Sequence, residues 1–160
     1  MVVYGNAEMI RVYIETSALG FYYDDRAPRE RDAIRRLIEK LDGKNIMGLT
    51  SEVTIEEVQR APANISAPLL RVIEQTGLQV VQITPEVARL AEVYLEAGVI
   101  PRTHPADATH VAAGVIHRAD VIASYNLKHL ASYRAVALVN TLNRERGLRT
   151  IDIRTPEQIP

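Results

Sequence analysis

The stretch PADATHVAAGVIHRADVIAS, residues 105–124, decides the expected fold because it joins a buried helix directly to a buried strand. Residues 105–117 carry alanine and valine on every side of the predicted helix, which is typical of a helix covered by the rest of its molecule. Residues 120–124 form a short run rich in Val, Ile and Ala, which is typical of a parallel strand buried on both faces. The stretch therefore predicts an α/β protein.

The same alternation of strand and helix runs along the rest of the chain. We expect four more strands, at residues 11–14, 44–50, 78–84 and 150–153. We expect helices at residues 28–41, 51–59, 66–75, 85–97 and 136–146, the fourth of them capped by Thr84 with Pro85 at its first position. This order predicts a parallel β-sheet flanked by helices, and 160 residues fit a single domain over residues 1–160.

The composition excludes several classes of protein. Lys and Arg number 19 against 20 Asp and Glu, so the chain lacks the basic excess of many nucleic-acid binders. It has no cysteine, which excludes disulfides, thiolate metal sites and cysteine nucleophiles and fits a reducing cytosol. No apolar run approaches the ~20 residues of a membrane span, and the first residues do not resemble a signal peptide. We expect a cytoplasmic protein without a membrane partner.

Acidic and amide side chains follow the predicted strands at their carboxyl ends, where ligands bind in parallel sheets. Glu15 follows the first strand, the run TSEVTIEEV at residues 50–58 follows the second, and Asn126 comes shortly after residue 124. Asp107 lies in the first turn of the alanine-rich helix. Within the run, Glu57 shares a helical face with Val53, whereas Glu56 lies about 100° away. We expect Val53 and Ile55 to face inward, which puts Glu57 at the edge of the buried side.

Each of these residues also has a simpler interpretation. Asp107 is a common helix-start acid, Glu57 a solvated charge, and Asn126 a turn residue. Glu15 has the weakest alternative, because a charge at the end of a central strand is costly to bury unpaired. Together, these oxygen donors predict a site for Mg²⁺ or Mn²⁺, which would relieve the repulsion among the carboxylates. Such an ion could also orient water for attack on a phosphate.

Several neighbouring side chains are candidates for substrate binding or catalysis. Ser17 and Thr16 lack a base placed nearby by the sequence, so we expect hydrogen bonding to Glu15 or to phosphate rather than nucleophilic attack. Lys128 and His129 are candidates for gripping phosphates, as are the arginines that follow the first motif, Arg26, Arg29 and Arg31. Surface charge alone explains each of them equally well.

Two further features have open interpretations. His110 lies on the same side of its helix as Asp107. We favour a core histidine with one hydrogen bond, since a zinc site would lack ligands. Tyr22 and Tyr23 are candidates for base stacking, although we favour apolar packing at a protein interface.

Four stretches in order resemble the PIN-domain ribonucleases, the fold of the VapC-type toxins of toxin–antitoxin systems. VYIETS (12–17) is similar to that family's first strand with its acidic motif, and TSEVTIEEV (50–58) to the segment with its second acid. HPADATHVAAGVIHRADVIASYNLKHL (104–130) is the closest match, and VNTLNRERGLRTIDIRTPEQI (139–159) resembles the C-terminal part of a PIN subgroup. The resemblance covers nearly the whole chain.

The resemblance implies a role for each candidate residue. It places Glu15, Glu57, Asp107 and Asn126 at the four acidic positions that hold one or two Mg²⁺ or Mn²⁺ ions, with Ser17 at the small polar position beside the first. It also implies a single-stranded RNA substrate, a homodimer in many members, and an antitoxin protein as partner. Glu15 and Asn126 depart from the family pattern, in which the first position is usually Asp and the fourth is often Asp. These departures bear on metal affinity and activity rather than on fold.

We therefore expect a metal-dependent endoribonuclease that cleaves single-stranded RNA as the toxin of a toxin–antitoxin pair. The alternative is a catalytically weak PIN domain that acts by binding RNA or protein. A receiver-like phosphate-transfer domain is disfavoured, because the first strand ends in Glu rather than Asp and no well-placed Lys follows the last strands.

Overall fold

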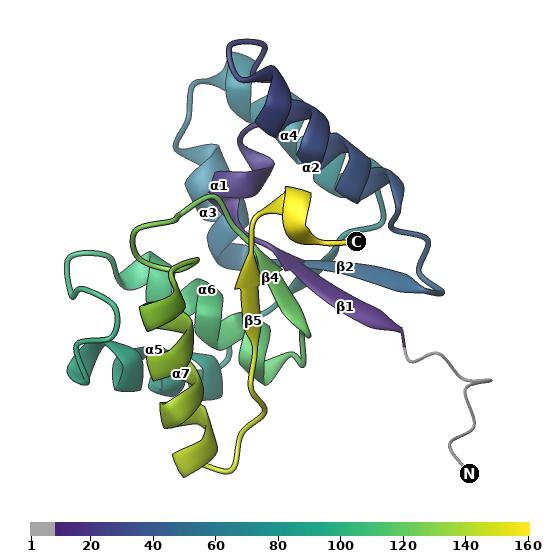
Figure 1. Cartoon of the computed structure of the whole chain (residues 1–160). Coiled ribbons are helices and arrows are strands. Elements are labelled where there is room, and N and C mark those ends of the chain that lie inside the picture. Colours follow the sequence, from purple (N-terminus) through teal and green to yellow (C-terminus); the bar gives the residue numbers. More distant parts are fainter. Residues whose placement is uncertain (1–8) are drawn as a thin grey trace, which may run out of the picture.

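A five-stranded parallel sheet forms the centre of the protein (Figure 1). The computed structural model describes residues 9–160. The strands are β1 (Ile10–Ile14), β2 (Ile46–Ser51), β3 (Gln79–Val81), β4 (Val121–Ala123) and β5 (Asp152–Arg154). They pair in the order β3-β2-β1-β4-β5, and every pair is parallel. The predicted α/β architecture is confirmed.

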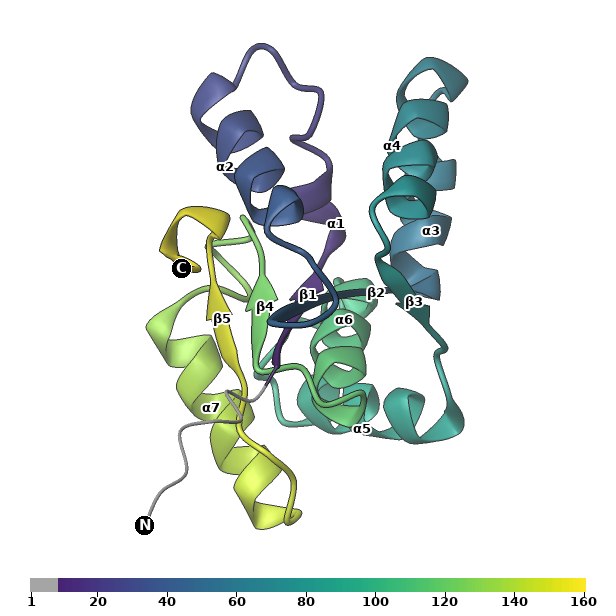
Figure 2. The ribbon, with the colours of Figure 1, turned by 90° about the vertical axis from the view of Figure 1, so that its right-hand side faces the viewer.

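Helices cover both faces of the sheet (Figure 2). The helices are α1 (Thr16–Leu19), α2 (Pro28–Glu39), α3 (Glu52–Gln59), α4 (Ala63–Gln75), α5 (Pro85–Glu96), α6 (Pro105–Ile116), α7 (Tyr133–Glu145) and the 3₁₀ turn η1 (Pro156–Gln158). One buried cluster packs α5, α6 and α7 against one face of the sheet. A second cluster packs the helices α1, α2, α3 and α4 and the end of the chain against the other face. The protein is therefore a three-layer α/β domain.

The central strand β1 shows why the sequences of the strands are continuous apolar runs. Tyr13 packs into the cluster with α5 and α6, whereas Val12 and Ile14 pack into the cluster on the opposite face. All three side chains are fully buried. Successive strand residues point to opposite faces, so a strand covered on both sides needs apolar residues at every position.

The strand order places a topological switch point between β1 and β4. From β1 the chain moves outward through β2 to β3, and it then returns to add β4 and β5 on the other side. Ile14 lies beside Ala123 in the register of β1 and β4. Ligands of open α/β sheets bind beyond the strand ends at such a point, which here is where Glu15 and Ser124 lie side by side.

Helix α6 packs closely on the sheet at Gly114. A Cβ atom added there would lie 3.0 Å from Ile122 Cδ1 and 3.1 Å from Ile151 Cδ1. The absence of a side chain lets α6 approach β4. This contact fixes the height of α6 above the sheet, and with it the position of the polar residues in its first two turns.

Several predicted boundaries differ from the structure. The third strand, expected over residues 78–84, is limited to Gln79–Val81. Helix α4 begins directly after Pro62 and so includes part of the segment expected to separate two helices. Helix α7 begins at Tyr133 rather than at residue 136, because Ser132 accepts the N–H of Ala135 and caps it there. The short α1 and η1 lie where no helix was expected.

Helix α3 also buries different residues from those expected. Thr54 and Val58 are its buried residues, while Val53 and Ile55 are half-buried. Glu57 is half-buried, as expected for a residue at the edge of the buried side. None of the helices formed by residues 9–160 has both the length and the apolar character that crossing a membrane requires.

Candidate functional site

Glu15 lies at the end of β1 and is the most buried carboxylate of the site, with 3% of its surface exposed. Its Oε1 accepts hydrogen bonds from the backbone N–H of Ala18, at 3.0 Å, and from the Ser17 hydroxyl. Glu15 is therefore the N-cap of α1. Burial raises the pKa of Glu15, an effect that outweighs the lowering by the charge of His110 and by the hydrogen bonds from Ser17 and Ala18.

Ser17 joins the ends of β1 and β4. Its hydroxyl donates to Glu15, and its oxygen accepts the backbone N–H of Tyr125 at 2.9 Å. The Ser124 hydroxyl lies 3.5 Å from the same oxygen and accepts the backbone N–H of Asn126 at 3.0 Å. The segment after β4 is thus held against the candidate site by hydrogen bonds to two serine hydroxyls.

Glu57 reaches the same edge of the sheet from α3. Its Oε1 accepts the Thr16 hydroxyl at 2.7 Å and lies 2.5 Å from His110 Nε2. Burial alone would raise the pKa of this carboxyl, but the hydrogen bond and charge of His110, together with Thr16, leave the pKa below its usual value. The neighbouring acids point elsewhere: Glu56 is exposed and Glu52 accepts the backbone N–H of Ile83 at 2.9 Å.

His110 is the buried centre of a polar chain that sequence reasoning only partly anticipated. It is 1% exposed, and its Nδ1 lies 2.7 Å from the hydroxyl of the fully buried Tyr13. That hydroxyl donates to Ser51 Oγ at 2.7 Å, and Ser51 in turn caps α3 by accepting the N–H of Val53 at 3.2 Å. The expectation of a core histidine is confirmed, but both of its ring nitrogens are engaged rather than one.

The neighbours of Thr16 also differ from those expected. Sequence reasoning placed no base near it, yet His110 Nε2 lies 3.3 Å from Thr16 Oγ1. Because that hydroxyl donates to Glu57, Thr16 anchors the carboxylate. The signal that points to His110 is its spacing: a residue three positions after Asp107 projects from the same side of α6.

Asp107 forms the third part of the site with Asn126 and His129. Asp107 Oδ2 accepts the amide of Asn126 at 3.0 Å and lies 3.3 Å from His129 Nδ1. Asn126 Oδ1 accepts the backbone N–H of His129 at 3.0 Å. The rings of His129 and His104 meet edge to face with centroids 4.3 Å apart. Asn126 therefore ties Asp107 to the turn that follows β4.

The structure brings the predicted residues to one edge of the sheet. Glu15 and Ser17 follow β1, Asn126 follows β4, and α6 carries Asp107 one turn before His110, which contacts Glu57. Lys128 lies exposed in the turn beside His129. Over residues 9–160, no three His, Asp or Glu side chains stand together as a group that could hold a metal ion.

The donor set suits a hard divalent cation in its chemistry. Glu57 and Asp107 use Oε1 and Oδ2 for their hydrogen bonds, and their second oxygens accept none from any residue that the structure describes. Glu15 adds a desolvated carboxylate, for which a bound cation would be a favourable partner. Carboxylate oxygens held on one side and free on the other are suitable ligands for Mg²⁺ or Mn²⁺.

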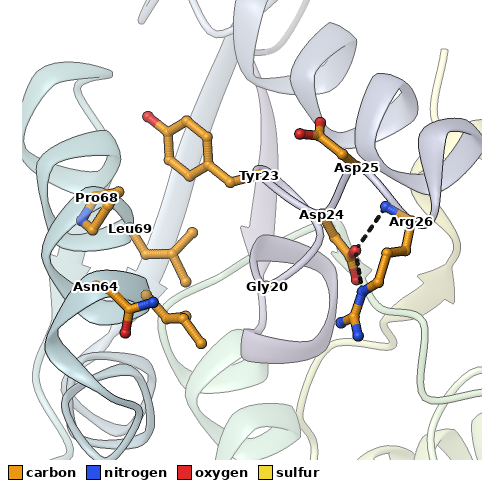
Figure 3. A pocket seen from close by; sticks show the side chains of 9 residues that line it. Gly20, Tyr23, Asp24, Asp25, Arg26, Asn64, Pro68 and Leu69 are labelled. Carbon is orange, nitrogen blue, oxygen red and sulfur yellow. Dashed lines mark hydrogen bonds and ion pairs between the residues drawn. The ribbon is translucent and has the colours of Figure 1, made fainter.

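The arginines after the first motif lie in a different environment. Arg26 contacts Asp24 at 3.2 Å, Arg29 lies 3.9 Å from Glu157, and Arg31 contacts Asp25 at 2.7 Å. Their charges are therefore balanced by nearby acids. A hollow of about 430 Å³ lies beside them, between the segment before α2 and the start of α4 (Figure 3). Tyr23, half exposed, and the apolar Pro68 and Leu69 line it.

Fold and site together define a class of protein: a three-layer α/β domain with one buried and two half-buried acids at the carboxyl edge of a parallel sheet. The PIN-domain family matches residues 12–136, which is most of the chain. The chain belongs to the PIN-domain family. Comparison with curated proteins finds no match.

Solved structures share this fold at low sequence identity. The Mycobacterium tuberculosis VapC20, a toxin that cleaves the sarcin–ricin loop, is 13% identical, with a TM-score of 0.56 over 74% of this chain and 92% of its own. VapBC from Salmonella typhimurium bound to DNA is 17% identical, with a TM-score of 0.56 over 92% and 99% of the two chains. VapBC2 from Rickettsia felis, bound to a DNA fragment from its promoter, is 9% identical, with a TM-score of 0.56 over 91% and 98%. At these identities the likeness shows the fold.

Proposed function

We propose that this protein is a Mg²⁺- or Mn²⁺-dependent endoribonuclease that cleaves single-stranded RNA as the toxin of a toxin–antitoxin pair. The observation that carries the proposal is that Glu15, Glu57 and Asp107 lie at one edge of the sheet of a PIN fold, where Glu57 and Asp107 each keep one oxygen that accepts no hydrogen bond from the described residues. The structural neighbours, which include a toxin and VapBC assemblies, support the biological role.

Each residue has a proposed role. Glu15, Glu57 and Asp107 hold the metal, and Asn126 contributes by orienting Asp107 and through the remaining lone pair of its Oδ1. Ser17, Lys128 and His129 contact the RNA. When bound, the cation supplies positive charge that neutralises phosphate oxygens and increases the acidity of a coordinated water. The chain itself fixes the carboxylates, through Ala18 for Glu15 and through Thr16 and His110 for Glu57.

The test is the Asp107→Asn variant with a labelled single-stranded RNA in MgCl₂ or MnCl₂, and in EDTA. We expect cleavage by the unmodified protein to need the metal and to fall by at least about 100-fold in the variant, because a ligand charge is lost. Glu74→Gln, at an exposed position on α4, is the matched control. Circular dichroism checks that both variants fold. Full activity in Asp107→Asn would remove this residue from the mechanism.

A second candidate is a catalytically weak PIN domain that binds RNA or protein. It is favoured by Asn126, whose amide engages Asp107 and His129 at its two ends and brings no negative charge. Calorimetric titration with Mg²⁺ and Mn²⁺ at neutral pH discriminates between the two. Measurable binding that is lost in Asp107→Asn supports the nuclease, and no binding by the unmodified protein supports the binding module.

We further propose that residues 1–160 form one domain that pairs with itself and with an antitoxin protein. The sheet supports a single unit, because β5, which follows the end of the family match at residue 136, pairs with β4. Co-expression with the product of an adjacent small gene, followed by sedimentation analysis, tests both associations. A monomer that captures no such partner would count against the toxin role while leaving the nuclease chemistry open to its own test.

A further inference from the structure

A hollow of about 280 Å³ lies next to the candidate site, between the turn after β4 and the start of α7. Three basic side chains line it: Lys128, His129 and Arg134. Its other lining residues are apolar or neutral, and none is acidic. Phosphate groups favour a surface of this kind, because each cation that contacts one releases condensed counterions.

The charge of this hollow distinguishes it from other hollows on the described surface. The one beside Tyr23 includes Asp24 and Asp25, two others include both Asp120 and Asp152, and a fourth includes Asp42. Lys128 and Arg134 are exposed and form no ion pair with any residue between 9 and 160, unlike Arg26 and Arg31. Their charge is therefore available to a ligand.

The hollow is connected to the candidate catalytic residues through the turn that carries Lys128. His129 lines the hollow and also lies 3.3 Å from Asp107 Oδ2. Asn126 fixes this turn, since its Oδ1 accepts the N–H of His129 at 3.0 Å and its backbone oxygen accepts the N–H of Leu130 at 3.1 Å. An RNA strand with one phosphate near Asp107 would therefore have its neighbouring phosphates near these basic side chains.

An exposed aromatic residue adjoins Arg134 in the sequence, just outside the lining of the hollow. Tyr133, between Ser132 and Arg134 at the start of α7, is 93% exposed, and Leu127 beside Lys128 is 59% exposed. An exposed aromatic ring next to a basic hollow is a combination that suits single-stranded nucleic acid, because any base can stack on the ring. A second copy of the chain is a poorer occupant, since a two-fold contact would bring two such basic patches together.

We propose that Lys128, His129 and Arg134 bind the phosphates on one side of the scissile bond of a single-stranded RNA and that Tyr133 stacks on one of its bases. This inference rests on the proposed function and extends it to a binding track outside the carboxylate site.

The experiment measures RNA binding separately from cleavage. Every variant is made in the Asp107→Asn background, and a fluorescein-labelled 12-nucleotide oligouridylate is titrated by fluorescence anisotropy between 50 and 200 mM KCl. We expect Lys128→Ala with Arg134→Ala to weaken binding at least about tenfold at the lower salt. The slope of log K against log salt should fall by about 1.4, or about 0.7 for each of two lost phosphate contacts.

Two comparisons make the result specific. Tyr133→Ala should weaken binding at least about fivefold and leave the salt slope unchanged, because stacking releases no counterions. Arg36→Ala with Lys40→Ala removes the same two charges from exposed positions at the far end of α2, next to the start of β2, and should change neither quantity.

Three outcomes would overturn the inference. If unmodified protein cleaves RNA while the Lys128 and Arg134 variant binds with unchanged affinity and slope, the track is wrong and the proposed function stands. If the double variant instead changes the oligomeric state or loses a co-expressed partner protein, the patch is a protein interface. If unmodified protein neither cleaves nor binds the RNA, the proposed function fails and the track fails with it.

Discussion

His110 has contacts that reach across most of the candidate site, from α6 to β1 and α3. Its two ring nitrogens lie 2.5 Å from Glu57 Oε1 and 2.7 Å from the Tyr13 hydroxyl. A buried polar chain of this kind stabilises the fold only while every member keeps its partner. The orientation of Glu57 therefore depends on a residue that lies outside the proposed set of metal ligands.

Removal of the Tyr13 hydroxyl tests this dependence. Tyr13→Phe keeps the ring but leaves His110 Nδ1 and the Ser51 hydroxyl buried with one partner fewer. We therefore expect the free energy of unfolding, measured in urea, to fall by about 1–3 kcal/mol. Tyr133→Phe makes the same chemical change at a residue that is 93% exposed and should leave stability unchanged. Equal stability of Tyr13→Phe and the unmodified protein would show that these buried hydrogen bonds make no net contribution to the stability of the fold.

The residue scale also shows the limit of sequence reasoning. Glu15, Glu57, Asp107 and Asn126 could be chosen from their places after strands and in a first helical turn, since such places meet at one edge of a sheet. The hydrogen bond between Tyr13 and His110 could not be predicted in this way. The two residues are 97 positions apart and meet only because α6 packs on β1. The direction of the Asn126 amide, with its nitrogen toward Asp107, likewise depends on a contact that has no local pattern.

At the scale of elements, α6 is positioned by its contact with β4 at Gly114. We expect Gly114→Val to push α6 away from Ile122, at a cost of about 1–3 kcal/mol for overpacking. The displacement should also lower RNA cleavage, because Asp107 and His110 move with the helix. Ala88→Val places the same side chain on the exposed face of α5 as a control. Urea unfolding and cleavage assays measure the two effects.

The turn before β2 provides an element-scale prediction about pH. Asp42 Oδ1 accepts the backbone N–H groups of Ile46, Lys44 and Asn45, at 3.1, 2.8 and 2.7 Å, and these bonds lower the pKa of Asp42 well below its ordinary value. The unfolded chain therefore binds the proton more readily than the folded protein. The stabilisation is present above about pH 4 and is lost as the pH falls toward the folded pKa.

We accordingly expect Asp42→Ala to lower the thermal midpoint by a few degrees at pH 7 and by less at pH 2. Thermal unfolding followed by circular dichroism from pH 7 to pH 2 measures this. A difference between variant and unmodified protein that stays constant over the range would show that the carboxylate does not act through its charge.

The elements themselves could be predicted wherever their signals are local. The strands could be predicted from their apolar runs. Helix α5 could be predicted from its Thr84 cap, and α6 from the alanines in its first turns. Helix α1 could not be predicted, because four residues carry no periodic pattern and their cap is the candidate ligand Glu15. The strand order is also set by packing between distant segments rather than by any single stretch.

At the scale of the whole molecule, the proposed cation should act as a stabilising ligand. A metal present at ten times its dissociation constant adds about 1.4 kcal/mol to the free energy of unfolding. We expect MgCl₂ or MnCl₂ to raise the thermal midpoint of the unmodified protein, EDTA to reverse the rise, and Asp107→Asn to show a smaller one. An equal rise in both proteins would place the ion elsewhere.

The position of β1 in the middle of the sheet has a consequence for a protein proposed to destroy RNA. Glu15 and Glu57 are translated early, but the edge on which they meet Asp107 and Asn126 forms only when β4, at Val121–Ala123, pairs with β1. A ribosome that has made the first hundred residues thus carries a chain without the complete candidate site. The proposed nuclease therefore stays inactive until β4 has been made and has paired with β1.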